Sequence, residues 1–359
     1  MTLELATAGE SHGPALVAIV AGLPAGLVLD RDAINADLRR RQQGYGRSPR
    51  QQIETDEVEV LAGLRHGRTL GTPLALVVRN RDHKNWTWGM SPWPPEGEPE
   101  GKGTKAVTLP RPGHADLAGV QKYGHSDVRD ALERASARHT AVHVAAGGVA
   151  KALLAAIGVE VHGEALAEHG ADATTVDQAR KERDTLGGTV LVRARNVPPG
   201  LGSYARKEDR LDARLATALM GIQAVKSVEI GDGKDLASLR GSEAHDEINP
   251  DRTRKTNRAG GIEGGMSNGE EVVVRASMKP LPTLMKPLQS VDLATGEPAE
   301  ALVERSDVSA VEALAVVAEA AVAFELARAA REKFGGDALD DFVAAWRAYL
   351  ERIPWRRTR

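Results

Sequence analysis

Runs of aliphatic and β-branched residues alternate with helix-like patterns along the chain. Residues 14–30 and 56–80 are rich in such residues and are broken by glycine and proline, which predicts strands. Between them, Ile34 and Leu38 fall on one face of a short helix expected over 32–41. Further strands are expected at 158–163, 188–195, 225–230 and 271–278.

The clearest helical pattern runs from 128 to 157, where apolar residues recur every three or four positions. Gly147 and Gly148 inside this pattern predict close packing against another element. More helices are expected at 209–222, from about 308 to 334, and from 337 to 350. In contrast, proline, glycine and tryptophan crowd residues 83–107, and we expect a long loop there.

The order of these elements bears on the fold class. Strands and helices are mixed without a regular strand–helix–strand rhythm, which favours an α+β fold over a doubly wound sheet. We find no internal repeat and no linker-like segment. One domain over 1–359 is therefore expected, with a C-terminal helical tail at 336–359.

Composition narrows the function classes. Hydrophobic residues make up 42% of the chain and charged residues 27%, as in soluble globular proteins. The net charge of −3 argues against a general nucleic-acid binder. The absence of cysteine excludes disulfides, thiolate chemistry and Cys-ligated metals, and it suits the cytoplasm. The apolar run at 14–29 follows Glu4 and Glu10 and contains Pro24, so we interpret it as core strand, with neither export nor membrane insertion.

Two histidines lie in glycine-rich or proline-rich settings. His12 is part of Gly-Glu-Ser-His-Gly at 9–13, and His114 is part of Arg-Pro-Gly-His-Ala-Asp at 111–116. Histidine is the side chain whose ordinary pKa lies near physiological pH, so this pattern indicates proton chemistry. The alternative is two surface-loop histidines that only contact backbone groups.

Arginines gather between residues 39 and 50, around Gly-Tyr-Gly at 44–46. The set is Arg39, Arg40, Arg41, Arg47 and Arg50. Guanidinium groups match carboxylates and phosphates bidentately, so the cluster favours a site for a multiply charged anion. The alternative is a solvated helix end, where basic side chains favour the dipole. That alternative explains positions 39–41 better than Arg47 and Arg50.

Three later segments carry weaker signals. Residues 257–269 are glycine-rich without matching a phosphate-binding or dinucleotide-binding motif, and a tight turn explains them equally well. Lys-Pro-Leu-Pro-Thr at 279–283 offers Lys279 and Thr283 as polar contacts on a rigid backbone. Asp307 or Ser306 is expected to cap the helix that follows, although an aspartate there could also relay protons.

Taken together and in order, these segments resemble the chorismate synthase family. The matches are 9–13, 39–50, 111–116, 134–138 (Arg-Ala-Ser-Ala-Arg), 223–226 (Gln-Ala-Val-Lys), 260–269, 279–283 and 305–307. The resemblance spans residue 9 to about residue 335. It implies a single-domain α+β fold, a β-α-β sandwich, and a homotetramer.

The resemblance also implies an activity. Members are lyases of the shikimate pathway, which leads to the aromatic amino acids, and they convert 5-enolpyruvylshikimate 3-phosphate to chorismate and phosphate. This is a 1,4-elimination assisted by reduced FMN without net redox change. Because the chain has no large insertion, we expect an external flavin reductase to supply reduced FMN. NADPH is expected only as an indirect electron source or as a ligand at Arg41 and Arg47.

Site residues follow from the resemblance position by position. His12 would protonate the departing phosphate, His114 would balance the anionic flavin, and Asp307 with Ser11 would relay the proton that reaches flavin N5. The substrate would be bound by Arg41, Arg47, Arg50, Arg111 and Arg138. FMN would be contacted by Arg134, Ala135, Ser136, Gln223, Ala224, Gly264, Lys279, Leu281, Pro282, Thr283 and Arg305. No metal is expected.

In three of its departures from the family pattern, the chain replaces a residue that is usually charged. Ser126 stands where arginine is usual, and His139 and His143 stand where glutamate and arginine are usual. The change at Ser126 removes a charge, yet the two histidines, Asp307 and the main arginines are all present. Two other functions stay open from the sequence: a flavin enzyme that performs net redox chemistry, and a polyanion-binding protein, which 3% aromatic content and negative charge disfavour.

Overall fold

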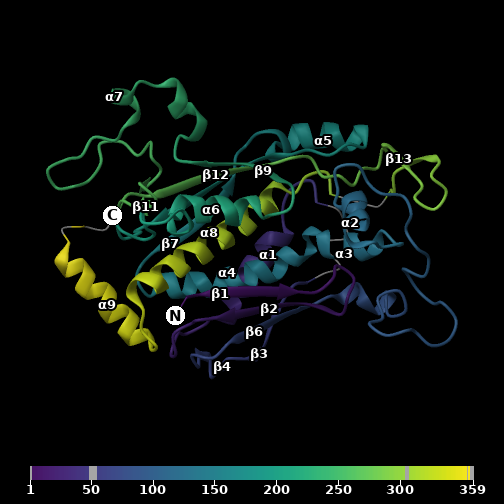
Figure 1. The fold of residues 1–359 in the computed structure, drawn as a ribbon, viewed down its shortest axis with the longest axis horizontal. Helices are drawn as coiled ribbons and strands as arrows, with labels where there is room; N and C mark the ends of the chain where they lie inside the picture. The colour runs from purple at the N-terminus through teal and green to yellow at the C-terminus, as the bar shows by residue number, and fades with distance from the viewer. Residues whose placement is uncertain (1, 48–54, 304–306, 354, 356–359) are drawn as a thin grey trace.

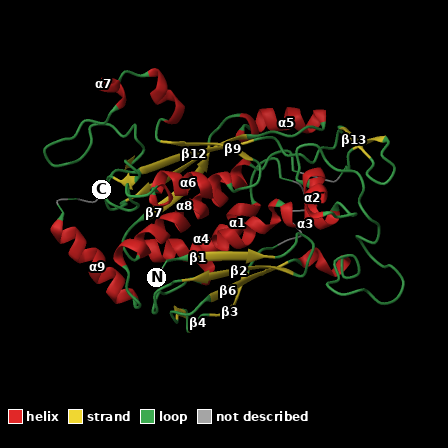
Figure 2. Cartoon of the chain, in the orientation of Figure 1, coloured by secondary structure: helices red, strands yellow, loops and turns green. Residues whose placement is uncertain are grey.

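The computed structural model describes residues 2–47, 55–303, 307–353 and 355. Two four-stranded antiparallel sheets enclose a layer of helices, which gives three layers in the order sheet, helices, sheet (Figures 1 and 2). The predicted α+β class and the β-α-β sandwich are confirmed.

The first sheet has the strand order β1-β2-β6-β3. Its strands are β1 (Glu4–Ala8), β2 (Ala15–Ala21), β6 (Leu74–Arg79) and β3 (Val58–Ala62). Along β2, Leu16, Ala18 and Val20 are buried while Ile19 is 44% exposed, because alternate side chains of a strand point to opposite faces. One face of this sheet therefore packs on the helices.

The second sheet has the strand order β7-β8-β12-β9. Its strands are β7 (Glu160–Ala165), β8 (Gly188–Arg195), β12 (Val272–Met278) and β9 (Val225–Ile230). Val190, Val192 and Ala194 of β8 are buried toward the helices, and Arg193 and Arg195 alternate with them and pair with Glu271. The outer face of β8 thus carries charge toward the end of the strand.

Four helices fill the middle layer: α1 (Arg31–Gln42), α4 (Thr140–Ala155), α6 (Leu211–Met220) and α8 (Val311–Phe334). Most residues of α8 are buried because it is covered on several sides. Gly147 of α4 lets this helix approach α8 closely, since a Cβ at Gly147 would lie 2.3 Å from Cβ of Ala320. The close packing predicted from the glycine pair is confirmed.

One carboxylate, Glu319 of α8, is buried between the layers. Arg40 of α1 donates to its oxygens at 3.0 and 2.9 Å, and the backbone N–H of Gly163 in β7 donates at 2.8 Å. Lys151 of α4 donates at 2.7 Å. Burial raises the pKa of Glu319, but these partners outweigh it and hold the pKa below its ordinary value. The buried charge therefore joins elements from three parts of the chain.

The remaining elements lie around this sandwich. They are α2 (Asp116–Tyr123), α3 (Arg129–Ala135), α5 (Ala173–Glu182), α7 (Gly241–Ala244), α9 (Leu339–Arg352), the 3-10 helices η2 (Arg81–Asn85), η3 (Ala137–His139), η4 (His169–Ala171), η5 (Lys207–Asp209) and η6 (Gly233–Ser238), and the short strand pairs β4–β5 (Leu64–Arg65, Arg68–Thr69), β10–β11 (Ile262–Glu263, Met266–Ser267) and β13–β14 (Gln289–Val291, Pro298–Glu300). The helices α2 and α3 lie at one end of the sandwich, and α9 lies at the other (Figure 1).

Two expectations about elements are wrong, and one strand of the first sheet lies outside the predicted ranges. The helix predicted over 128–157 is interrupted at Ser136, whose extended backbone separates α3 from η3 and α4. The last long helix begins at Val311 instead of 308, and its N-cap is Ala310, so Asp307 does not cap it. The strand β1 precedes the first predicted strand and was not predicted at all.

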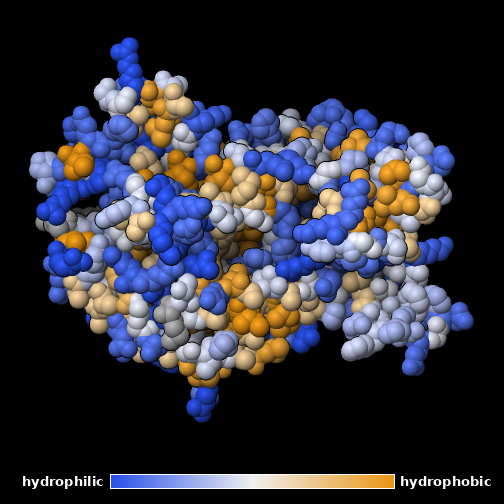
Figure 3. All heavy atoms as spheres, in the orientation of Figure 1, coloured by the Kyte–Doolittle hydropathy of each residue, from blue (hydrophilic) through white to orange (hydrophobic). Residues whose placement is uncertain are grey.

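The outer surface is mostly polar on the face drawn in Figure 3, with apolar groups in separate patches. Within the described ranges, the helices include none that is both long enough and apolar enough to span a membrane.

Candidate active site

A cavity of about 510 Å³ is lined in part by residues of α3 and of the loop before α2. Its walls come from the N-terminal turn, the end of α1, the loop before α2, the α3–α4 junction, the turn before β9, the segment after β12, and α8. The predicted site residues that line it are Ser11, His12, Arg41, Arg47, Arg111, His114, Ala135, Ser136, Arg138, Gln223, Ala224, Lys279, Leu281, Pro282, Thr283 and Asp307.

Four predicted site residues are not among the lining residues. Arg134 is exposed and donates to the backbone oxygens of Thr7 and Gly9. Gly264 lies in the turn between β10 and β11. Arg50 and Arg305 lie outside the described residues. Their roles stay predictions.

His12 is held by a buried glutamate. Its Nδ1 lies 2.8 Å from Oε1 of Glu133, and its backbone N–H donates to Oε2 at 2.8 Å. Both side chains are buried, at 7% and 2% exposure. Burial raises the pKa of Glu133, but hydrogen bonds and charge from His12, with Arg129 nearby, hold it below its ordinary value. Glu133 is therefore a carboxylate at neutral pH.

His114 has a matching partner two residues along the chain. Its Nδ1 contacts Oδ1 of Asp116, and Asp116 is fully buried. Burial raises the pKa of Asp116, but the contacts with His114 and Arg111 outweigh the effect of burial. The pKa of Asp116 therefore lies well below its ordinary value. In both histidines of the cavity, Nδ1 thus contacts an ionised carboxylate that is buried and does not itself line the cavity.

Arg111 lies beside this second pair. Its guanidinium donates to Asp116 at 2.8 and 3.1 Å and to Oγ1 of Thr283 at 3.0 Å, and its Nη2 lies 3.1 Å from Nδ1 of His114. The guanidinium therefore ties the loop before α2 to the segment after β12, and its predicted contact with substrate stays a prediction.

Two other arginines share a buried aspartate. Arg138 donates to the carboxylate of Asp56 at 2.7 Å, and Arg41 donates to it at 3.3 Å. Asp56 is only 1% exposed. Burial lowers the pKa of Arg41 from its ordinary value to about 10, against the raising effect of Asp56, so Arg41 is still cationic at neutral pH. One carboxylate thus holds two guanidinium groups at the cavity wall.

Arg47 and Asp307 form another ion pair at the cavity. Nη1 of Arg47 lies 3.0 Å from Oδ2 of Asp307, and both side chains are mostly buried. Burial lowers the pKa of Arg47, and Asp307 and Glu312 oppose that change. Among the described residues that line the cavity, five are Arg or Lys and one is Asp. The lining is therefore strongly cationic.

Small polar groups complete the walls. Oγ of Ser136 lies 3.2 Å from Oγ of Ser11 and also accepts the N–H of Arg138 at the start of η3. The ammonium of Lys279 contacts the backbone oxygen of Gly113. Ala224 lines the cavity and adopts a left-handed φ of 69°, which is uncommon for alanine.

Two of the departures from the family pattern, His139 and His143, are not among the residues that line the cavity. The rings of His139 and His143 make an edge contact at 5.2 Å between centroids. Burial lowers the pKa of both, that of His143 to about 4, so the pair is uncharged at neutral pH. Nε2 of Gln223 lies 3.0 Å from Nε2 of His139, so His139 does contact a residue of the wall.

Several functional neighbours were not predicted. No sequence motif marks Glu133, Asp56 or Trp86. Each of them contacts a site residue that lies far away in the sequence. Asn80 is similar: its amide donates to the backbone oxygens of Glu10 and Gly13 and so shapes the turn that carries His12. The tryptophans of the predicted 83–107 loop are the sequence signal that could have drawn attention to Trp86.

Comparisons with known proteins agree with this geometry. The family model described as chorismate synthase matches residues 3–330. The proteins named chorismate synthase in Symbiobacterium thermophilum and Desulforudis audaxviator are 52% and 51% identical to this chain, and the alignments cover 98% and 99% of it and 99% of each relative. A solved structure titled as a crystal structure of chorismate synthase superimposes with a TM-score of 0.78 at 34% identity, covering 99% of both chains. The chain belongs to the chorismate synthase family.

Proposed function

We propose that this chain converts 5-enolpyruvylshikimate 3-phosphate to chorismate and phosphate by a 1,4-elimination assisted by reduced FMN. Family membership supports chorismate formation in the shikimate pathway. One observation carries the finer proposal: two histidines, each bonded through Nδ1 to an ionised carboxylate, line a single cavity rich in arginine and lysine.

The cationic lining suits the substrate. It carries a phosphate and two carboxylates, and guanidinium groups bind such anions bidentately. Arg41, Arg47 and Arg138 are mostly buried and already fixed by Asp56 and Asp307. A guanidinium that is held before binding loses little conformational freedom when the anion arrives. These arginines therefore bind and orient the substrate.

The histidines and Asp307 handle protons. His12 protonates or neutralises the departing phosphate, and Glu133 stabilises the charged ring while it does so. His114, with Asp116 next to its Nδ1, would hold positive charge at the cavity wall and balance an anionic flavin. Asp307, with Ser11, takes up and passes on the proton lost from C6. Each role needs a group that exchanges charge in a site with little water.

The residues present fit FMN. The cavity volume lies in the range of cofactor sites. Oε1 of Gln223 and Nε of Arg47 are buried and make no hydrogen bond with any residue that the structure describes, so they leave an acceptor and a donor for a ligand. Ala135, Ser136, Ala224, Lys279 and Thr283 would hold the cofactor with Gln223. When bound, reduced FMN would supply electron density that helps phosphate to leave and recover it as the C6 hydrogen departs.

Five further parts of the proposal rest on the sequence and on family membership. The enzyme is a cytoplasmic homotetramer, it has one domain, an external flavin reductase supplies reduced FMN, and NADPH acts as an indirect electron source. Arg41 and Arg47, the alternative NADPH ligands, lie among the arginines that we assign to substrate.

An anaerobic assay tests the proposal. Purified protein is mixed with 5-enolpyruvylshikimate 3-phosphate and chemically reduced FMN, and chorismate and phosphate are quantified. Equal amounts of both products support the elimination, and no product should form when FMN is left oxidised. Oxidation of one reduced FMN per molecule of product would instead show a flavin enzyme with net redox chemistry. Failure to form product with reduced FMN would contradict the proposal.

A further inference from the structure

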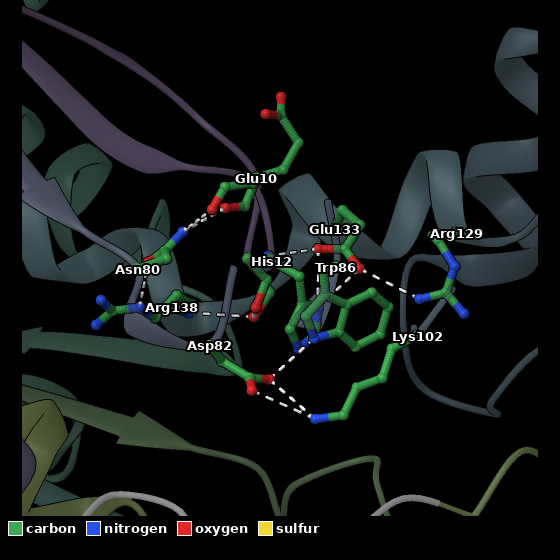
Figure 4. A network of polar contacts seen from close by, with 12 residues as sticks. Glu10, His12, Asn80, Asp82, Trp86, Lys102, Arg129, Glu133 and Arg138 are labelled. Carbon is green, nitrogen blue, oxygen red and sulfur yellow. Dashed lines mark hydrogen bonds and ion pairs between the residues drawn. The ribbon is translucent and has the colours of Figure 1, made fainter. Parts of the chain in front are cut away.

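Glu133 contacts both the backbone N–H and the ring Nδ1 of His12. Its Oε2 accepts the backbone N–H of His12 at 2.8 Å, and its Oε1 lies 2.8 Å from Nδ1 (Figure 4). Arg129, one helical turn earlier on α3, contacts the same carboxylate at 3.4 Å. The backbone and the ring of His12 are therefore fixed by one side chain, 121 residues along the chain.

The charge of Glu133 determines which ring nitrogen carries the proton. An ionised carboxylate only accepts hydrogen bonds, so Nδ1 must donate to it. The pKa of Glu133 is held below its ordinary value by His12, against burial, which keeps it ionised. In the neutral ring, the proton is then on Nδ1, and Nε2 is the basic nitrogen.

Trp86 covers one face of the same ring. Its indole stacks on His12 with the ring centroids 4.0 Å apart and the planes at 22°. The indole N–H donates to Asp82 at 2.9 Å, and Asp82 also pairs with Lys102 at 3.2 Å (Figure 4). The guanidinium of Arg129 lies 4.9 Å from the centre of the indole ring. These contacts fasten the start of the 83–107 loop onto His12.

We propose that Glu133 is a positioning residue that holds His12 in the Nδ1–H tautomer, so that proton transfer by His12 runs through Nε2, and that Trp86 keeps the ring in this position. The part of this inference that concerns proton transfer rests on the proposed function. The part that concerns the tautomer and the ring position does not, and it is measured without substrate or flavin.

The wild-type protein tests the tautomer directly. Nitrogen-15 NMR of the ring, with His12 assigned by its loss in His12→Asn, distinguishes a protonated Nδ1 from a protonated Nε2 in the neutral ring. The spectrum is recorded at rising pH until the ring is neutral. We expect the Nδ1–H form to dominate, and a dominant Nε2–H form would overturn the proposal whatever the protein catalyses.

Glu133→Gln should reverse the tautomer. A glutamine has one acceptor oxygen where the glutamate has two. The backbone N–H of His12 can only donate, so the oxygen of Gln stays there and the amide NH₂ faces Nδ1. Nδ1 must then accept, and the proton moves to Nε2. A variant that keeps the Nδ1–H form while it is folded would overturn the proposal.

Kinetics complete the test. If His12 acts through Nε2, Glu133→Gln should lower kcat about 100-fold, with a much smaller change in KM, because the loss affects general acid catalysis. Glu247→Gln is the matched control, since it removes the same charge from an exposed pair with Lys255. An unchanged kcat in Glu133→Gln would remove Glu133 from the proton pathway.

Trp86 is tested by two variants. Trp86→Phe keeps an aromatic face for stacking but loses the hydrogen bond to Asp82, whereas Trp86→Ala loses both. We expect Trp86→Ala to shift and broaden the His12 ring signals and to lower kcat about 10-fold, and Trp86→Phe to restore most of both. Wild-type signals and wild-type kcat in Trp86→Ala would overturn the role of Trp86.

Discussion

Asp116 is a fully buried carboxylate that contacts Nδ1 of His114, at the wall of the cationic cavity. Because its pKa is held well below the ordinary value, it stays charged at neutral pH and stabilises a protonated imidazole. The arrangement repeats the pair of Glu133 and His12. Two unrelated segments thus place a histidine against the cavity with a carboxylate behind it.

Removing the charge of Asp116 should impair His114. We expect Asp116→Asn to lower kcat about 100-fold, since the variant keeps the shape of the side chain but no longer stabilises the cation. Steady-state kinetics with reduced FMN measures this effect. Asp177→Asn, which changes an exposed pair with Arg180, is the control. Equal kcat values in both variants would contradict a charge-holding role for His114.

Loss of either cavity histidine should slow turnover without unfolding the chain. We expect His12→Ala and His114→Ala each to lower kcat about 100- to 10,000-fold, the usual range for general acid catalysis. Circular dichroism should match the wild-type protein. Near-wild-type rates in both variants would show that neither imidazole handles a proton in the reaction.

Arg47 should contribute more to substrate binding than to the chemical step. Arg47→Ala removes a mostly buried guanidinium next to Asp307, and we expect substrate affinity to fall about 10- to 100-fold, as for loss of a hydrogen bond to a charged group. Isothermal titration with substrate and oxidised FMN measures it. Arg206→Ala, at an exposed pair with Asp209, should change nothing. Unchanged affinity in Arg47→Ala would move the anion site elsewhere.

The contact between α4 and α8 should tolerate no side chain at Gly147. A Cβ there would lie 2.3 Å from Cβ of Ala320, so Gly147→Ala forces the helices apart. We expect the free energy of unfolding to fall by about 1–3 kcal/mol, the usual cost of overpacking. Urea denaturation measures it. Gly241→Ala is the control, because its Cβ would meet only atoms at 3.9 Å. A variant as stable as wild type would show that α4 and α8 can move apart without loss of stability.

The sequence predicted the local elements better than their ends and partners. The bounds of β8 and β9 match the predicted ranges because alternating aliphatic residues between turn signals mark a strand locally. In contrast, β1 (Glu-Leu-Ala-Thr-Ala) has little strand propensity, and its pairing with β2 determines its conformation. The break at Ser136 has a similar origin, since apolar spacing continues across it.

The candidate site was likewise predicted where the signal is local in sequence and missed where it depends on distant contacts. Motifs and resemblance brought together most residues of the cavity wall, because each has a recognisable neighbourhood in sequence. Glu133 lies next to a recognised motif, yet its partner is 121 residues away, and Asp56 reaches Arg138 across 82 residues. No periodicity or spacing encodes such contacts, because they depend on how the layers pack.

Stability should fall in mildly acidic solution because of His143. Burial lowers its pKa from 6.5 to about 4, so between these values the unfolded chain binds a proton that the folded chain does not. The free energy of unfolding should therefore be highest above pH 6.5 and fall as the pH drops toward 4. His143→Leu should flatten this slope, and the exposed His245→Leu should not. Urea midpoints across this range measure both, and identical slopes would contradict the burial effect.

The ratio of chorismate formed to flavin oxidised tests the central claim most directly. Under strict anaerobiosis, protein with excess 5-enolpyruvylshikimate 3-phosphate receives a limiting amount of reduced FMN, and chorismate and the flavin spectrum are followed together. The account predicts many molecules of chorismate per flavin while the flavin stays reduced. One product molecule per flavin oxidised, or no chorismate at all, would contradict it.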